Sequence, residues 1–133
     1  MIDNIRLSDA ARSKLIRLKA KTGIQHWNVL CRWAFCLSLA EASTPPDEDI
    51  PFDSSLEMSW RTFTGGQDEV YRAVLVTRAI RDGIPLTTNA IQHYFRLHLH
   101  RGISYLASQQ PDSIASMVNL GLRNKRRKAT KAA

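Results

Sequence analysis

The sequence has no long hydrophobic run and only two cysteines. A membrane-spanning helix needs about 20 consecutive apolar residues, and no segment of the 133 residues approaches that length. A secretory signal is also missing, because Asp3, Arg6 and Ser8 interrupt the start of the chain. Cys31 and Cys36 lie five positions apart in one expected helix, on different sides of it, so we expect two reduced thiols. These absences predict a soluble cytoplasmic protein with no membrane partner.

Acidic residues are missing from most of the N-terminal third and from the C-terminal end. Residues 1–40 carry seven basic and two acidic groups, residues 41–122 carry six and ten, and residues 123–133 carry six and none. The net charge of these segments is therefore +5, −4 and +6, within a chain of net charge +7. Positive charge at both ends of a mildly acidic middle is typical of a protein that binds a polyanion.

Catalytic motifs are absent as well. There is no Gly-rich phosphate loop, nucleophile elbow or zinc motif, and the Gly65-Gly66 pair is too short to count. Four carboxylates could in principle hold Mg²⁺ for strand cleavage, but their Pro-rich loop has no second acidic cluster beside it. They are Asp47, Glu48, Asp49 and Asp53. We predict no catalytic residue, no metal and no cofactor.

Histidine and cysteine are explained more simply without metal or redox chemistry. The spacing of His93, His98 and His100 places only the first and last on one helix face, so we expect histidines at the surface or facing DNA. The apolar neighbours of Cys31 and Cys36 favour inert buried thiols, with a sulfur relay as the alternative.

The apolar pattern predicts a mainly α protein, with one helical domain over residues 1–122 and a basic, disordered tail over residues 123–133. The domain begins with a strand and two helices (4–42), continues through an acidic, Pro-containing loop and a bridge (43–66), and ends in a small helical bundle (67–122). The expected helices span 9–22, 25–42, 67–81 and 88–101, with a stop at Gly102 and two shorter pieces around Pro111.

The first strand and the first helix sort their side chains by face. In the strand, Ile5 and Leu7 are expected to point inward and Asn4 and Arg6 outward. The helix has an apolar stripe and two cationic flanks. The stripe is Ala11, Leu15, Leu18 and Thr22; Lys14, Arg17 and Lys21 share one flank, and Arg12 and Lys19 lie on the other. Like charges at such spacings disfavour a helix, so an unneutralised surface of this kind indicates an anionic partner.

The second helix is apolar nearly all round, and such a helix needs to be buried on every side. A chain of this size cannot cover both sides of it alone, which predicts a symmetric homo-oligomer, either a dimer or a tetramer. The expected interface residues are Trp27, Val29, Trp33, Cys36 and Leu39.

The order strand, basic helix, glycine, apolar helix over residues 4–40 resembles the ribbon-helix-helix DNA-binding proteins. In such proteins two strands, one from each subunit, pair into a ribbon that enters the major groove. The resemblance implies that Asn4 and Arg6 face the groove, where Arg suits a guanine edge and Asn an adenine edge. It also implies that backbone N–H groups near Gln25 and His26 are offered to a phosphate. A helical bundle with an extended N-terminal arm is the simpler alternative.

A longer resemblance covers about residues 4–122. The segments that carry it are IRLSDAARSKLIRLKAKTGI, RWAFCLSL, GGQDEVYRAVL and FRLHLHRGISYLA. They are similar to DndE, a small subunit of the bacterial DNA phosphorothioation system, which replaces a non-bridging phosphate oxygen of DNA with sulfur. The resemblance implies an oligomeric accessory subunit that binds double-stranded DNA, including nicked duplex, beside sulfur-mobilising and ATPase subunits. The basic tail extends beyond the recognised pattern.

We therefore predict a non-catalytic subunit that binds the DNA backbone. The expected DNA-binding residues are Asn4, Arg6, Arg12, Lys14, Arg17, Lys19, Lys21, Arg123, Lys125, Arg126, Arg127 and Lys128. Two alternatives stay open. One is a ribbon-helix-helix transcriptional regulator or antitoxin that reads an operator through Asn4 and Arg6; the other is a DNA nickase in the same modification pathway.

Overall fold

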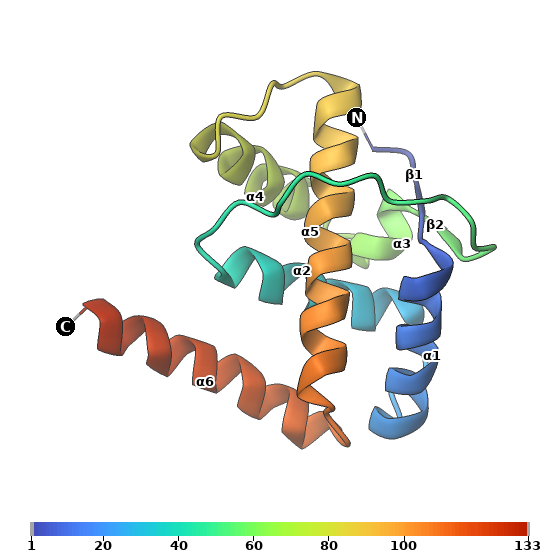
Figure 1. Cartoon of the computed structure of the whole chain (residues 1–133), viewed down its shortest axis with the longest axis vertical. Helices are drawn as coiled ribbons and strands as arrows, with labels where there is room; N and C mark the ends of the chain where they lie inside the picture. The colour runs from blue at the N-terminus through green and yellow to red at the C-terminus, as the bar shows by residue number, and fades with distance from the viewer. Residues whose placement is uncertain (1, 133) are drawn as a thin grey trace.

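The computed structural model describes the backbone of residues 2–132 and the side chains of residues 2–123. Within this part the chain forms six helices and one two-stranded sheet, which confirms the predicted mainly α class (Figure 1). The elements are β1 (Asn4–Arg6), α1 (Asp9–Thr22), α2 (Trp27–Ala40), β2 (Glu57–Ser59), α3 (Trp60–Thr64), α4 (Asp68–Arg81), α5 (Thr88–Gln109) and α6 (Ile114–Ala132). No helix in the described part is both long and apolar enough to cross a membrane.

The first helix begins and ends where the sequence predicts. Ser8 precedes α1, and its hydroxyl accepts a hydrogen bond from the backbone N–H of Ala11 at 3.1 Å, which caps the helix. Gly23 ends α1 in the left-handed conformation, with φ of 78°. The predicted inward stripe is buried: Ala11, Leu15, Leu18 and Thr22.

The long helix α5 runs through the middle of the molecule and α2 crosses it (Figure 1). An aromatic cluster fills the core where α2, α3 and α5 meet. The ring centroids of Phe35, Phe63 and Phe95 lie 5.1–5.7 Å apart, and all three side chains are almost fully buried. Tilted and edge-on ring contacts of this kind add about 0.5–1.5 kcal/mol per pair beyond the burial itself.

The predicted stop at Gly102 was wrong, because this glycine lies inside α5, which continues to Gln109. A Cβ atom on Gly102 would lie 1.7 Å from the carbonyl oxygen of Ala34 in α2. The glycine therefore allows the backbones of α2 and α5 to touch rather than ending a helix. The end of α5 is at Gln110, which takes the left-handed conformation with φ of 48° and precedes Pro111.

The segment expected to form a strand or bridge over residues 57–66 divides into β2 and α3. Ser59 caps α3 by accepting a hydrogen bond from the backbone N–H of Thr62, and Gly65 ends it with φ of 64°. β2 pairs antiparallel with β1, with Ile5 opposite Met58. The strand partner that the ribbon-helix-helix pattern assigns to a second subunit is thus supplied by the same chain.

The last helix, α6, extends into the C-terminal end. The backbone of α6 is helical from Ile114 to Ala132, in keeping with the high helix propensity of the Ala, Lys and Arg residues that dominate its second half. The side chains of residues 124–133 lie outside those that the structure describes, so the predicted contacts of Lys125, Arg126, Arg127 and Lys128 fall outside it too.

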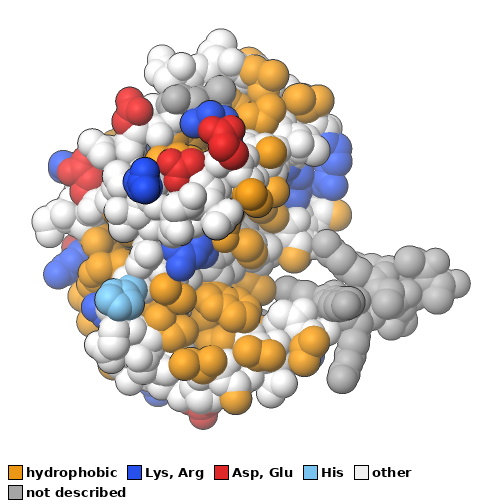
Figure 2. Space-filling model, turned by 180° about the vertical axis from the view of Figure 1, so that it is seen from behind, with side chains coloured by type: hydrophobic (Ala, Val, Ile, Leu, Met, Phe, Trp, Pro, Cys, Tyr) orange, Lys and Arg blue, Asp and Glu red, His pale blue; other side chains and the backbone are white. Residues whose placement is uncertain are grey.

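Some large apolar side chains remain at the surface. Figure 2 shows groups of them on the face of the molecule seen from behind α5. The largest exposed fractions belong to Phe52, Ile80 and Ile114, each at 61–62%. Exposed apolar groups that gather on one face mark contact surfaces more often than those scattered singly.

The contact between α2 and α5 predicts opposite effects for two glycine substitutions. Gly102→Ala should lower the free energy of unfolding by roughly 3 kcal/mol, because the added methyl group overlaps a backbone carbonyl that cannot move aside. Gly121→Ala, whose nearest atom is Cζ3 of Trp33 at 3.8 Å, should raise it by about 0.5–1 kcal/mol. Urea unfolding followed by circular dichroism measures both values, and equal effects would contradict the packing argument.

Candidate nucleic-acid interface

The predicted groove-facing strand presents its side chains as expected. Asn4 and Arg6 are exposed, while Ile5 between them is 2% exposed. Arg6 also has a carboxylate partner, because its Nη2 donates to Oε2 of Glu57 across the sheet at 3.1 Å. A solvent-exposed ion pair is worth only about 0–1 kcal/mol, so a phosphate can compete with Glu57 for this guanidinium.

Arg96 of α5 holds β1 in place through hydrogen bonds to its backbone. Its side chain is buried, and its guanidinium donates to the carbonyl oxygens of Arg6 at 3.2–3.3 Å, Ile50 at 2.8 Å and Pro51 at 3.1 Å. The ring of Phe52 covers the guanidinium at 3.7 Å. Burial lowers the pKa of Arg96, yet an arginine stays charged at any ordinary pH. This one side chain therefore joins β1 to the loop that precedes β2.

His100 fixes the start of α1. Its Nε2 accepts a hydrogen bond from the backbone N–H of Ser8 at 3.1 Å, and its Nδ1 donates to the carbonyl oxygen of Arg96 at 2.9 Å. Burial is the main cause that lowers the pKa of His100 to about 4, so the imidazole is neutral at neutral pH. His100 therefore helps to hold the start of α1 in place on α5.

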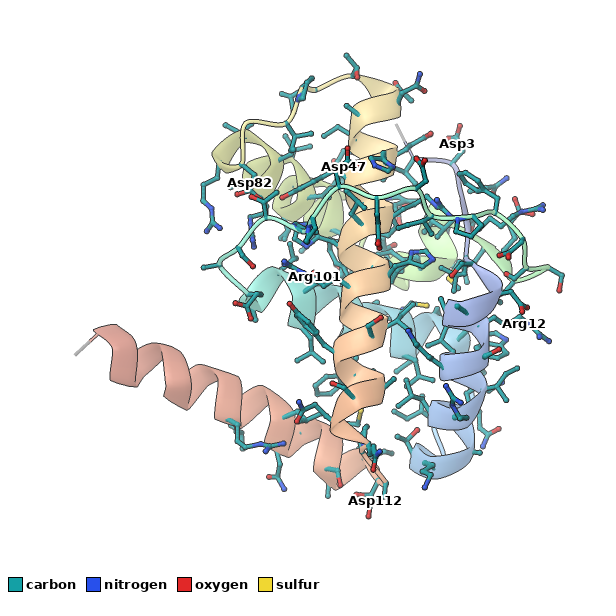
Figure 3. The ribbon with its side chains drawn as sticks, viewed as in Figure 1. Asp3, Arg12, Asp47, Asp82, Arg101 and Asp112 are labelled. Atoms are coloured by element: carbon teal, nitrogen blue, oxygen red, sulfur yellow. The ribbon has the colours of Figure 1, made fainter. Side chains whose placement is uncertain are left out.

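The cations of α1 lie on two opposite flanks of the helix, as predicted. On one side Nζ of Lys14 donates to Oγ of Ser104 in α5 at 3.1 Å. On the other side Nζ of Lys19 lies 4.0 Å above the ring of Trp27 in α2, and Arg12 points away from α5 (Figure 3). The five cations therefore do not form one continuous face of the helix.

These cations have no acidic partners in the described part of the chain. Its five ion pairs include none of Arg12, Lys14, Arg17, Lys19 and Lys21. The charge of Lys21 contributes, after the larger effect of the hydrogen bond from Ser116, to lowering the pKa of Asp112. The surface of α1 is thus open to an external anion.

The start of α2 lies beside the Lys19 flank of α1. Its N-cap residue, His26, makes no side-chain hydrogen bond to the first turn, and Gln25 and His26 are both exposed. Backbone N–H groups of an uncapped first turn favour an anion. A phosphate contact at Gln25 and His26 stays a prediction.

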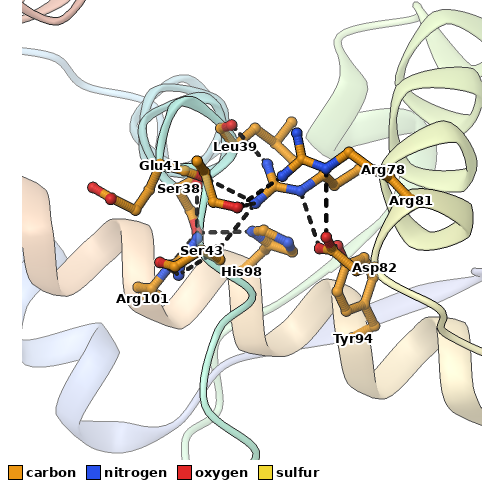
Figure 4. A network of polar contacts seen from close by, with 11 residues as sticks. Ser38, Leu39, Glu41, Ser43, Arg78, Arg81, Asp82, Tyr94, His98 and Arg101 are labelled. Atoms are coloured by element: carbon orange, nitrogen blue, oxygen red, sulfur yellow. Dashed lines mark hydrogen bonds and ion pairs between the residues drawn. The ribbon is translucent and has the colours of Figure 1, made fainter. Parts of the chain in front are cut away.

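Two arginines, the buried Arg78 and the half-buried Arg101, hold the other end of α2 (Figure 4). The guanidinium of Arg78 in α4 donates to the carbonyl oxygens of Leu39 and Glu41, each at 2.7 Å, and to that of Ser43 at 3.0 Å. Arg101 of α5 donates to the carbonyl oxygen of Ser38 at 2.8 Å. Cations at the C-terminus of a helix also suit the helix dipole, so both arginines stabilise α2 in two ways.

Asp82 supplies the charge that Arg78 needs in its buried position. Its Oδ2 accepts hydrogen bonds from Nε of Arg78 at 3.0 Å and from the hydroxyl of Tyr94 at 2.5 Å. Burial raises the pKa of Asp82, but these two hydrogen bonds and the nearby arginines outweigh burial and lower it overall. Burial and the same carboxylate raise the pKa of Tyr94.

His98 lies beside this cluster and is fully buried. The hydroxyl of Ser38 accepts from Nε of Arg101 at 2.8 Å and is therefore free to donate to Nδ1 of His98, also at 2.8 Å. Nε2 of His98 has no hydrogen-bond partner among the described residues. Burial, followed by the charges of Arg101 and Arg78, lowers the pKa of His98 to about 3.

The prediction of surface or DNA-facing histidines was therefore right for His93 alone. His93 is half-buried, and its Nε2 lies 2.6 Å from Oδ1 of Asp47, whereas His98 and His100 are buried. Both alternate with Leu97 and Leu99 in a stretch of α5 that is enclosed on every side. The sequence of this stretch mixes polar and apolar residues, so it did not indicate a helix that is buried on every side.

The acidic loop is tied to the body of the protein at its two ends. Besides the contact of Asp47 with His93, Oδ1 of Asp53 accepts from the backbone N–H of Asp9 at 2.7 Å. In the part of the chain that the structure describes, no three His, Cys, Asp or Glu side chains are grouped to hold a metal ion.

The two cysteines differ in surroundings. Cys31 is fully buried, and burial raises its pKa to about 12, so it stays a neutral thiol. Cys36 is exposed, contrary to the expected burial, although partial desolvation still raises its pKa. Cys36 shares the outer side of α2 with half-buried neighbours, namely Val29, Trp33 and Leu39. Trp27 is half-buried on the side beneath Lys19.

Three arginines that donate to backbone carbonyls were missed from the sequence: Arg78 and Arg96, which are buried, and Arg101, which is half-buried. The apolar stripe of residues 67–81 includes Arg78, and a charged residue on such a stripe is a signal of a buried, paired cation. Cations on other elements were also missed, such as Arg61, which is exposed on α3, and Arg32, whose Nη1 donates to the carbonyl oxygen of Phe63 at 2.9 Å.

The buried arginine cluster predicts a large loss of stability when it is broken. Arg78→Ala should lower the free energy of unfolding by about 3 kcal/mol, because Asp82 loses its closest cation and keeps only Arg81, at 3.5 Å, while the last carbonyls of α2 lose their donor. Arg72→Ala is the matched control, since Arg72 forms an exposed ion pair with Glu69 in the same helix and its removal should cost only about 0.5 kcal/mol. Equal losses in urea unfolding would show that the cluster does not hold α2.

The buried imidazole predicts a pH-dependent stability. Unfolded His98 binds a proton below its ordinary pKa of 6.5, whereas folded His98 does so only near 3. The unfolded state therefore binds more protons in this window, and the free energy of unfolding falls as the pH is lowered, by up to about 1.4 kcal/mol per pH unit. His98→Gln should remove the part of this slope that comes from one buried imidazole and leave the part that comes from His100, whose pKa is lowered to about 4. Urea unfolding at stepped pH measures the slope of each protein, and an unchanged slope would contradict the prediction.

Comparisons with known proteins agree with this fold. Residues 4–113 match the family described as DNA sulphur modification protein DndE. The crystal structure of DndE from Escherichia coli B7A, involved in DNA phosphorothioation modification, is similar with a TM-score of 0.66 and 25% identity over 80% of this chain and 98% of that chain. A DndE mutant involved in DNA phosphorothioation gives 0.63 and 21%, over 81% and 99%. No curated protein matches the chain. Because the family match spans most of its length, this protein belongs to the DndE family.

Proposed function

We propose that this protein is a non-catalytic, DNA-binding subunit of the DNA phosphorothioation machinery, and that it holds the DNA backbone with the cations of α1. The family supplies the link to DNA sulphur modification. The observation that carries the DNA contact is the absence of any ion pair to the α1 cations among the described residues. Contacts to phosphates position a protein on DNA without reading its sequence.

The two flanks of α1 have different surroundings. The flank of Arg12 and Lys19 borders the uncapped start of α2, where His26 is exposed. The flank of Arg17 and Lys21 borders α5 through Lys14. One duplex surface cannot reach both flanks of one helix equally. We assign the main footprint to Lys14, Arg17 and Lys21, because this flank carries three cations and the other carries two. Arg123 and the basic residues after it extend the positive charge of the chain as a separate arm.

The protein is further proposed to act as a homo-oligomer that meets the other subunits of the machinery. The support is the outer side of α2, where Val29, Trp33 and Leu39 are only half-buried and Cys36 is exposed. An oligomer multiplies the phosphate contacts, and each one steepens the dependence of log K on log salt by about 0.9.

A transcriptional regulator is less well supported. The strand that would enter the groove pairs with β2 of its own chain instead of with a strand of a second subunit. Competition binding distinguishes the two functions, because a repressor should prefer its operator over random DNA by about 10³-fold or more.

For the nickase alternative, the test is incubation of the protein with supercoiled plasmid and Mg²⁺. Nicking that disappears when the Asp47–Asp53 loop is mutated would replace the accessory role with an enzymatic one.

Charge reversal on α1 tests the footprint. The double variant Arg17→Glu, Lys21→Glu should weaken binding to a random duplex by roughly tenfold or more at physiological salt, and should reduce the salt slope by about 1.8 through the loss of two phosphate contacts. Both residues are exposed, so the fold should be unaffected.

The matched control is Arg61→Glu with Arg72→Glu, which changes the net charge equally on α3 and α4. Fluorescence anisotropy at several salt concentrations measures each variant. If both double variants lose affinity to the same extent, only net charge matters, and α1 is not the footprint.

A further inference from the structure

The turn that joins α5 to α6 lines a hollow of about 540 Å³, here called the α5–α6 hollow. α5 ends at Gln109, and Gln110 takes the left-handed conformation with φ of 48°. This conformation is uncommon for a residue other than glycine, and the chain changes direction here so that α6 leaves α5 at an angle (Figure 1). The family match ends at residue 113, so the side of the hollow that α6 supplies lies beyond the matched pattern.

Four polar side chains line the α5–α6 hollow without a partner among the described residues. They are those of Gln109, Gln110, Asn119 and Arg123, and all four residues are exposed. Three of these side chains are amides, which donate and accept hydrogen bonds, and the fourth is a guanidinium, which only donates. The hollow therefore offers several donor groups that no other described part of the chain uses.

Asp112 is the one carboxylate among the residues that line the α5–α6 hollow. Its Oδ1 accepts a hydrogen bond from the hydroxyl of Ser116 at 2.6 Å, which is the largest cause that lowers the pKa of Asp112. Lys21 of α1 adds to the same effect, so this cation lies beside the hollow. Figure 3 shows Asp112 at the end of the molecule where α1 also ends. Together, Lys21 and Arg123 outweigh the single negative charge.

Donor groups of this kind suit a phosphate. Arginine, asparagine and glutamine side chains donate many of the hydrogen bonds that proteins make to the phosphate oxygens of DNA, and the planar fork of an arginine matches two of those oxygens. A concave surface admits the sugar–phosphate ridge of a duplex, whereas the base edges are recessed in the grooves. A divalent cation is a poorer match, because it needs more oxygen ligands than one carboxylate supplies.

We propose that the α5–α6 hollow binds the sugar–phosphate backbone of the DNA that α1 holds, through donor groups of Gln109, Asn119 and Arg123. This inference rests on DNA binding in the proposed function and adds a second contact to it. Lys21 links the two contacts, because it belongs to the assigned flank of α1 and acts on Asp112 at the hollow. The basic residues of the chain continue after Arg123, so the hollow connects the α1 footprint with that arm.

Two substitutions that preserve side-chain shape test the contact: Gln109→Glu with Asn119→Asp in the full chain. Each replaces an amide that donates to a phosphate by a carboxylate that cannot donate and repels it. The affinity for a random duplex should fall by roughly tenfold or more at physiological salt, because like charges are brought together in the contact. Fluorescence anisotropy measures the affinity. Arg123→Gln should in addition reduce the salt slope by about 0.9, the value of one phosphate contact.

The matched control is Gln67→Glu with Asn89→Asp, which makes the same two exchanges at exposed positions near the starts of α4 and α5. Asn89 lies about 30 Å along α5 from Gln109, so its charge is screened from DNA at the hollow and the affinity should stay unchanged. If circular dichroism shows that the carboxylates disturb the helices, Gln109→Ala with Asn119→Ala removes the donors without adding charge. That variant should lower the affinity by about fivefold.

The outcomes separate this inference from the proposed function. If Arg17→Glu with Lys21→Glu lowers the affinity and the variants at the hollow do not, α1 holds DNA and this inference is wrong. If the carboxylate variant at the hollow and its control lose affinity equally, only net charge matters and the inference is again wrong. If the unmodified chain binds no duplex even at low salt, the proposed function and the inference both fail. A loss at the hollow with an unchanged control supports the second contact.

Discussion

The crossing of α2 over α5 is the constraint on which the rest of the structure depends. The backbone carbonyl of Ala34 occupies the space where Gly102 lacks a side chain, so the two helices touch directly. This contact brings Phe35 into the aromatic cluster with Phe63 and Phe95. It also places the end of α2 beside α4 and α5, where two arginines satisfy its last carbonyls. Without the crossing, these two guanidinium groups would lose their carbonyl acceptors on α2.

The N-terminal unit could be predicted because its signals are local. Ser8 caps the first helix, Gly23 ends it, and the stripe from Ala11 to Thr22 repeats at the helical period. The same local rule failed at Gly102, since a glycine that ends a helix and a glycine that admits a neighbouring backbone look alike in sequence. Only the position of α2, set by contacts from far along the chain, distinguishes the two.

The supporting side chains of the candidate interface could not be predicted for a related reason. Arg78, Arg96 and His100 lie among mostly apolar neighbours in sequence, which indicates burial, but their partners lie in segments about 35 to 92 positions away. Burial of a cation requires these partners to be in place, and a single sequence does not show which carbonyls will come together. The exposed cations of α1 were easier to find, because the absence of acidic residues is visible in the sequence itself.

The arginines that hold the end of α2 and the strand β1 also act on the connection between them. Residues 41–56 have no helix or strand, and such a segment is normally the first place that a protease cuts. Here guanidinium groups of Arg78, Arg96 and Arg101 grip its carbonyl oxygens at both ends. A protease needs the backbone extended and detached, so cleavage at residues 41–43 or 50–51 requires α4 or α5 to move away first. The exposed residues 46–49 between these two held ends are therefore the expected site of the first cut.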